Sequence, residues 1–212
     1  MHVPVFDALR DRDHPGAELR HLVAPQLLER TRAQGPESVT PALAALLTAA
    51  GPGPVLVTCS TIGAVAESLA PALGYPVLRV DRPMAAMAVR RGARITVLAA
   101  LESTLAPTEA LLAEEAAGRP VSVRGQLVAG AWEHFEAADT AGYLARVAEA
   151  ADAVTDADVI VLAQASMAAA AELTTSRIPV LSSPAPGLAA GLRLLRPRSA
   201  EAAAGTEAAA GA

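Results

Sequence analysis

The sequence predicts an α/β fold with two pseudo-symmetric lobes, each a parallel sheet flanked by helices. Three observations support this prediction: short apolar runs alternate with alanine- and leucine-rich helical segments, most of these runs lack polar alternation, and two parts of the chain repeat each other. An apolar run without alternating polar residues is typical of a strand buried on both faces. Strands that alternate with helices indicate a parallel sheet with right-handed crossovers.

The predicted elements follow from these patterns in order along the chain. We expect strands over 54–58, 76–80, 94–100, 120–123, 158–162 and 178–182. We expect helices over 38–50, 61–73, 83–91, 106–117, 139–155, 166–175 and 186–195. Hydroxyl residues, Pro107 and Glu109 mark the start of the fourth helix, and Asp139 marks the start of the fifth, as capping residues do.

The two ends of the chain depart from the strand–helix pattern. Residues 2–6 read HVPVF, which indicates the end of a strand or a loop that enters a helix, so a first strand is missing or truncated, or the start codon is assigned too late. The low-complexity stretch over 199–212 predicts a disordered tail. We therefore expect one folded unit over 1–198, with one lobe over about 1–90 plus a C-terminal return and the other over about 91–185.

Composition excludes several function classes. The net charge of −5 and the 2% aromatic content, with no basic run, argue against binding to nucleic acid. One cysteine excludes an internal disulfide and a cysteine-based zinc site, and it agrees with a reducing cytoplasm. No signal peptide, membrane-spanning run or nucleotide-binding motif is visible. We expect a cytoplasmic protein without a membrane partner, a metal or a cofactor.

An internal repeat supports the two-lobe prediction. Residues 56–67 (LVTCSTIGAVAE) can be laid over 161–172 (VLAQASMAAAAE), and 75–83 (YPVLRVDRP) over 178–186 (IPVLSSPAP). In these overlaid segments, prolines, glutamates and hydroxyl residues occupy the same positions. The repeat implies two similar lobes that face each other across a cleft, each presenting a strand-end loop and a helix N-terminus.

The strand-end turns of the repeat hold the first candidate site residues. Cys59, Ser60 and Thr61 lie in the first turn, and Gln164 and Ser166 lie in the second. Free backbone N–H groups at a helix start, with hydroxyls beside them, form an anion site. We expect the hydroxyls to hold a carboxylate and the Cys59 thiol to have a pKa well below its ordinary value. The alternative is that the lone cysteine fills space in a core.

Further polar residues follow the other predicted strands. Ser103 and Thr104 lie at the sheet edge where ligands of parallel sheets bind, and we expect them to cap a helix, to bind substrate, or both. For residues 182–183 we expect a turn. Asp81 and Arg82 are expected to pair with each other, although Arg82 could instead meet an anionic substrate.

Several motifs in one order resemble the aspartate/glutamate/hydantoin racemase superfamily. They are residues 59–61 (CST), 101–108 (LESTLAPT), 130–133 (GAWE), 139–140 (DT) and 162–167 (LAQASM). The resemblance implies two lobes with the active site between them. It also implies cofactor-independent action on small carboxylates or related carbonyl compounds, as a racemase, cis–trans isomerase or decarboxylase of amino acid metabolism, and a possible homodimer.

The resemblance fails at one important position. Racemases of this family use two cysteines, one per lobe; the first falls on Cys59, but the second falls on Gln164, whose amide cannot exchange a proton near neutral pH. A single thiol can still protonate an enediolate on one face, or attack a double bond in cis–trans isomerisation.

The resemblance therefore leaves two functions open. In the first, the protein is an enzyme with Cys59 as acid/base or nucleophile, and its carboxylate-binding residues are Ser60, Thr61, Ser103, Thr104, Gln164 and Ser166. In the second, favoured by Gln164, it is a non-catalytic protein that binds a small carboxylate and has lost the second thiol.

Overall fold

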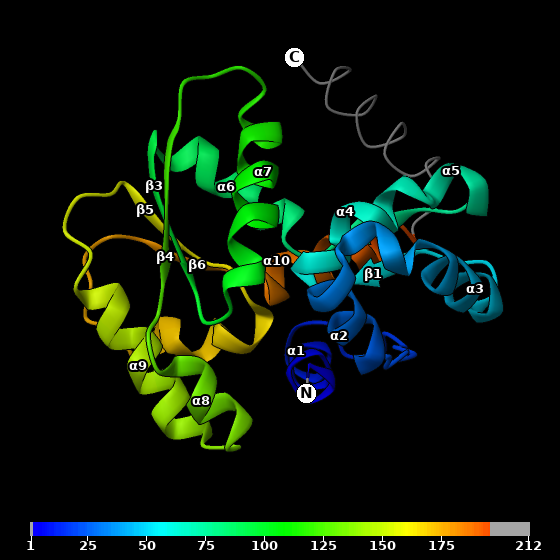
Figure 1. The fold of residues 1–212 in the computed structure, drawn as a ribbon, viewed down its shortest axis with the longest axis horizontal. Coiled ribbons are helices and arrows are strands. Elements are labelled where there is room, and N and C mark those ends of the chain that lie inside the picture. The colour runs from blue at the N-terminus through cyan, green and yellow to red at the C-terminus, as the bar shows by residue number, and fades with distance from the viewer. Residues whose placement is uncertain (1, 196–212) are drawn as a thin grey trace, which may run out of the picture.

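Two parallel sheets form the framework of the computed structural model, which describes residues 2–195 (Figure 1). The smaller sheet pairs β1 (Val55–Val57) with β2 (Val77–Arg79). The larger has the order β4-β3-β5-β6, with strands β3 (Arg94–Ala99), β4 (Ser122–Leu127), β5 (Val159–Leu162) and β6 (Val180–Ser182). All these pairings are parallel, as predicted from the apolar runs.

Helices connect the strands and cover the sheets. The α-helices are α1 (Val3–Asp13), α2 (Pro25–Gln34), α3 (Thr40–Ala50), α4 (Ser60–Ser68), α5 (Ala70–Leu73), α6 (Arg82–Arg91), α7 (Leu105–Ala116), α8 (Ala131–Glu136), α9 (Thr140–Asp152) and α10 (Pro184–Arg193). The 3₁₀ helices are η1 (Pro36–Val39), η2 (Glu102–Thr104) and η3 (Ala165–Glu172). We call the two-stranded sheet with its helices the first lobe and the four-stranded sheet with its helices the second lobe.

The two central strands of the four-stranded sheet, β3 and β5, are buried on both faces, which explains their mostly apolar sequences. Every residue of β5 is buried, and so is every residue of β3 after its first. Helices α6 and α7 pack on one face, around Val97 and Val161. Helices α8 and α9, with η3, pack on the other face, around Leu98 and Leu162.

The helices that follow β2 and β6 each cover the sheet of the other lobe. Helix α6 follows β2, yet its apolar residues belong to the core on the four-stranded sheet. Helix α10 follows β6, yet it packs against β1 and α1, and Figure 1 shows it between the two lobes. A Cβ added to Gly187 of α10 would lie 2.5 Å from the Val80 carbonyl oxygen, so only glycine permits this approach. Because α6 and α10 each cover the sheet of the other lobe, they join the two lobes. The predicted limits of the lobes at about 1–90 and 91–185 stay predictions.

The predicted repeat corresponds to matching strand–helix units. Strand β1 with α4 matches β5 with η3, and β2 with α6 matches β6 with α10. Two elements of the repeat differ from their predictions: the helix expected over 61–73 is divided into α4 and α5, and the segment expected as a helix over 166–175 is the 3₁₀ helix η3. The matching backbone at both turns is what places the candidate site residues.

The N-terminal prediction needs a correction. Residues 3–6, expected as a strand end or loop, form the first turn of α1, whose start carries Pro4. A proline in the first turn favours a helix because its fixed backbone angle suits that position. Helices α2 and α8 were not predicted, and the predicted tail over 199–212 lies outside the described residues.

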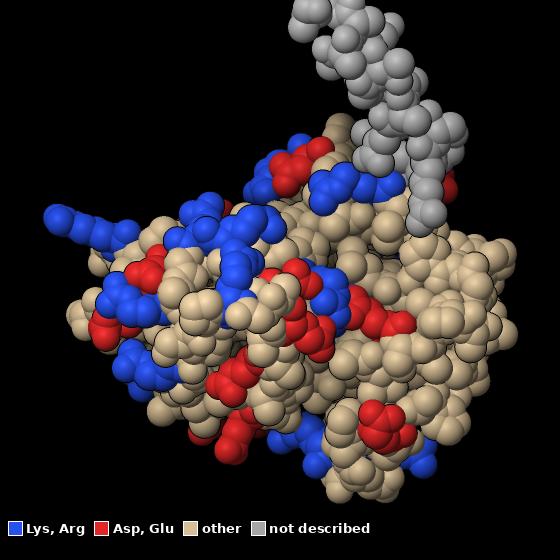
Figure 2. Space-filling model, turned by 90° about the horizontal axis from the view of Figure 1, so that it is seen from above, with Lys and Arg blue, Asp and Glu red and all other residues tan. Residues whose placement is uncertain are grey.

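Charge is distributed unevenly over the surface. On the face drawn in Figure 2, charged side chains gather over the second lobe, and the side with the first lobe shows few. The sequence explains this, because Glu67 is the only charged residue between Glu37 and Arg79. No helix within residues 2–195 is long and apolar enough to cross a membrane.

Candidate active site

The two strand-end turns of the repeat are in direct contact. The Ser60 hydroxyl donates a hydrogen bond of 3.0 Å to the carbonyl oxygen of Ala163, across the boundary between the lobes. Ser60 is buried, so this bond is shielded from water. The structure therefore brings Cys59 and Gln164, each next to one of these partners, to the same place. The Ser60 hydroxyl therefore joins the two lobes, and its role as a carboxylate donor stays a prediction.

Cys59 is half-buried at the start of α4 and partly packed against the core of the first lobe. Burial raises the pKa of its thiol, because the thiolate would lose water. The nearby backbone N–H groups of Ile62 and Thr61 and the Thr61 hydroxyl favour the thiolate and lower the pKa, but they do not outweigh burial. Our prediction of a lowered pKa is therefore wrong. At neutral pH the thiol is therefore protonated.

Gln164 is held by the end of β3. Its side-chain oxygen Oε1 accepts hydrogen bonds from the backbone N–H groups of Ala100 (2.6 Å) and Leu101 (3.2 Å). Two N–H donors at this end of the amide identify it as the oxygen, because the amide nitrogen could not accept them. The NH₂ group therefore points away from β3 and can only donate.

Two serine hydroxyls beside the sheet edge are buried without a hydrogen-bond partner. They are Ser103 Oγ, in η2 after β3, and Ser183 Oγ, in the turn between β6 and α10. Thr104 is 3% exposed and precedes α7, but its side chain makes no capping bond, so capping is wrong as its role. A buried hydroxyl without a partner is unfavourable and marks a position where a ligand can supply one. The sequence indicated only a turn at Ser183.

His2 also lies at the site, a residue that the sequence patterns do not assign. Its Nδ1 is 3.0 Å from the hydroxyl oxygen of Thr58, the residue before Cys59. Burial lowers the pKa of His2, so its imidazole is neutral at neutral pH. The contact links the N-terminus of α1 to the first turn.

A buried ion pair lies at the end of β2, the strand that pairs with β1. Arg79, 1% exposed, donates from Nε and Nη2 to both carboxylate oxygens of Asp81, at 2.8 and 2.9 Å. Arg79 also donates to the carbonyl oxygen of Pro107 in α7. The predicted pair of Asp81 with Arg82 is wrong; Arg82 instead meets the carboxylates of Glu67, Glu114 and Glu115.

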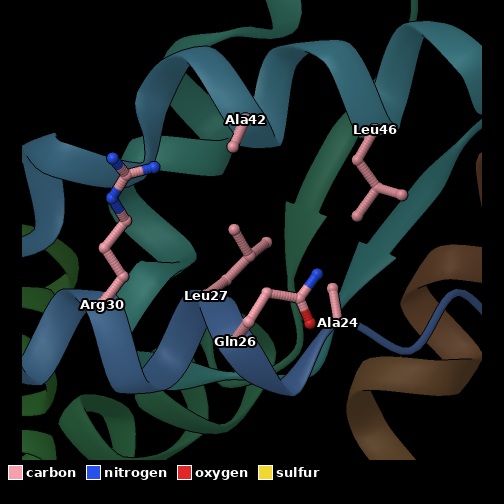
Figure 3. Close-up of a pocket in the computed structure, with 6 residues that line it drawn as sticks. All are labelled: Ala24, Gln26, Leu27, Arg30, Ala42 and Leu46. Carbon is pink, nitrogen blue, oxygen red and sulfur yellow. The ribbon is translucent and has the colours of Figure 1, made fainter.

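The pocket in Figure 3 is separate from these residues. It has a volume of about 400 Å³ and lies between α2 and α3, and its lining residues are Ala24, Gln26, Leu27, Arg30, Ala42 and Leu46. None of the predicted site residues lines it. Within residues 2–195, no group of three or more His, Cys, Asp or Glu residues is arranged to hold a metal ion.

Comparison with known proteins agrees with the two-lobed fold. The family model of the Asp/Glu/Hydantoin racemases matches residues 5–190. A comparison of the sequence with curated proteins gives no match.

Three solved structures illustrate the shared fold. Allantoin racemase from Pseudomonas fluorescens has a TM-score of 0.64 at 20% identity, over 92% of this chain and 86% of that chain. Glutamate racemase from Bacillus anthracis has a TM-score of 0.59 at 19% identity, over 76% of this chain and 66% of that chain. A mutant of arylmalonate decarboxylase has a TM-score of 0.51 at 22% identity, over 76% of each chain. At such low identities the likeness shows the fold alone.

Proposed function

The chain belongs to the Asp/Glu/hydantoin racemase family, and from this premise we propose that it is a cofactor-independent enzyme that transfers a proton to a small carboxylate through Cys59. The observation that supports the proposal is the contact of the two turns, in which Ser60, next to the protonated Cys59, bonds to Ala163, next to the neutral amide of Gln164. The two turns are therefore suited to different tasks.

Cys59 is suited to donating a proton to carbon. A raised pKa keeps the thiol protonated at neutral pH, so it is ready as a general acid and poor as a nucleophile. When the proton leaves, the N–H groups of Thr61 and Ile62 and the Thr61 hydroxyl stabilise the thiolate. Among the family's reaction types, these features favour protonation of an enediolate over attack on a double bond.

The second turn is suited to holding the substrate's oxygens. The NH₂ group of Gln164 is a donor whose direction is set by the two bonds to its carbonyl oxygen. Ser103, with its unpartnered hydroxyl, and Ser166 supply further donors on this side. We propose that these groups bind a carboxylate and stabilise the negative charge of the enediolate.

For a malonate-type substrate the step balances as follows. The bond between the α-carbon and one carboxyl group breaks, CO₂ leaves, and the electron pair forms the enediolate. The Cys59 S–H bond then supplies a proton to that carbon on one face, and water returns a proton to the thiolate. Racemisation would need a second proton carrier on the opposite face, and Gln164 cannot serve as one.

The alternative function is binding without catalysis. The observation that favours it is that the Gln164 oxygen accepts hydrogen bonds from the backbone N–H groups that follow β3. This gives the second turn a structural role that does not require catalysis.

Incubation in D₂O with malonates, maleate and amino acids separates the two functions. For the enzyme we expect CO₂ release, isomerisation or deuterium at the α-carbon, with loss of at least about a hundredfold in Cys59→Ala, as for removal of a proton-transfer group. Ser68→Ala, at the far end of α4, serves as the control and should keep full activity. Saturable binding of a carboxylate with no exchange in the unmodified protein would instead establish the binding function.

A further inference from the structure

A buried tyrosine contacts one of the proposed substrate-binding residues. The hydroxyl of Tyr143, in α9, lies 2.8 Å from the hydroxyl of Ser166, in η3. Tyr143 is 2% exposed, and its ring packs in the core of the second lobe beside Phe135, with ring centroids 5.2 Å apart. The phenol oxygen is therefore held in place by the packing of its ring.

The direction of this hydrogen bond follows from the burial of the two groups. Burial raises the pKa of Tyr143 to about 12, so the phenol keeps its proton at neutral pH. If Ser166 donated to the phenol, the phenol hydrogen would be buried without an acceptor, which is costly. If Tyr143 donates, its hydrogen is satisfied, and the hydrogen of the half-buried Ser166 is free to reach a ligand.

We propose that Tyr143 is a positioning residue that occupies one lone pair of the Ser166 hydroxyl, directs its hydrogen to the ligand and thereby favours a carboxylate at this side of the site. This inference rests on the proposed function. The Gln164 NH₂ group is a further donor two residues before Ser166, so a ligand bound at this turn is offered two donors. A carboxylate oxygen accepts both, whereas an amide NH₂ or ammonium group has no lone pair to accept either.

The chain offers a matched pair of variants for the test. It has two tyrosines, Tyr143 and Tyr75, and the Tyr75 hydroxyl donates a bond of 2.7 Å to the Leu47 carbonyl oxygen in the first lobe. Tyr143→Phe and Tyr75→Phe each remove one phenol oxygen and keep the ring. A loss confined to Tyr143→Phe therefore reports on the site rather than on a lost buried hydrogen bond.

Calorimetric titration with malonate and with its monoamide, malonamate, measures the selection. We expect the unmodified protein and Tyr75→Phe to prefer malonate, and Tyr143→Phe to lose about five- to tenfold of this preference, as expected for one hydrogen bond to a charged group. Ser166→Ala should lose at least as much of the preference for malonate as Tyr143→Phe does. The double variant that combines Tyr143→Phe with Ser166→Ala should lose no more than Ser166→Ala alone. Ser166→Thr keeps a hydroxyl and should keep most of the preference. Unchanged preference in Tyr143→Phe, or fully additive losses in the double variant, would overturn the proposal.

A second measurement tests the contact without any ligand. In Tyr75→Phe protein, Tyr143 is the one remaining tyrosine, and the carbon-13 signal of its Cζ atom reports whether the phenol donates. We expect Ser166→Ala to shift this signal and Ser68→Ala to leave it in place. If the unmodified protein binds neither malonate nor malonamate while the signal shifts as expected, the choice of a small carboxylate as substrate fails and the positioning role of Tyr143 stands. An unshifted signal removes the positioning role whatever the protein binds.

Discussion

The first and second turns share a backbone plan but differ in chemistry. Each follows a parallel strand and starts a helix, yet the first carries Cys59, which can exchange a proton, and the second carries Gln164, which can only donate and accept hydrogen bonds. The environment of Cys59 resists charge, and that of Gln164 fixes an orientation. The comparison teaches that a duplicated scaffold can keep its geometry while its two halves divide the work.

The neighbouring strands show the same contrast. In the repeat, Arg79 matches Ser182 and Asp81 matches Pro184, so a buried ion pair in the first lobe has an uncharged counterpart in the second. The carboxylate of Asp81 also raises the pKa of Cys59, after burial as the larger cause. The first lobe thus holds both the proton carrier and the buried charge.

Breaking the ion pair is expected to have the largest effect on stability. Asp81→Ala leaves the Arg79 guanidinium buried without its partner, which should lower the free energy of unfolding by about 3–5 kcal/mol. Asp156→Ala removes an exposed partner of Arg94 and is the control, with an expected change below about 1 kcal/mol. Urea unfolding of both variants measures the difference, and equal losses would show that the Arg79–Asp81 pair is dispensable.

The next effect concerns the amide of the second turn. Gln164→Leu leaves the N–H groups of Ala100 and Leu101 without an acceptor, so we expect a loss of about 2–3 kcal/mol. Gln164→Glu keeps an acceptor for both groups and should cost about 1 kcal/mol or less, while it removes the NH₂ donor and weakens carboxylate binding. Equal stability of the two variants would mean that the oxygen of Gln164 does not hold β3.

The smallest expected effect concerns the sulfur. Because burial raises the pKa of Cys59, its alkylation by iodoacetamide should be slow at neutral pH and rise about tenfold per pH unit, with no plateau up to pH about 9. Thr61→Val removes a donor to the thiolate and should slow alkylation about two- to fivefold at pH about 8. A free cysteine derivative is the control; a plateau near neutral pH in the protein would restore the sequence-based prediction of a lowered pKa.

What the sequence by itself determined is the local pattern and its consequences. Apolar runs such as 94–100 and 158–162 predicted buried parallel strands, because a strand covered on both faces favours apolar residues on both of them. The repeat and the motifs around Cys59 and Gln164 predicted two similar lobes with a turn in each. These features depend on neighbouring residues in the chain, so they are visible without coordinates.

Only the tertiary structure decided which groups meet and which are shielded from water. The bond of Ser60 to Ala163, the pairing of Asp81 with Arg79, and the contact of Tyr143 with Ser166 join residues whose sequence neighbours do not indicate them. The direction of the Cys59 pKa shift was predicted wrongly for the same reason. A helix start is visible in the sequence, but the loss of water around a side chain depends on every element packed near it.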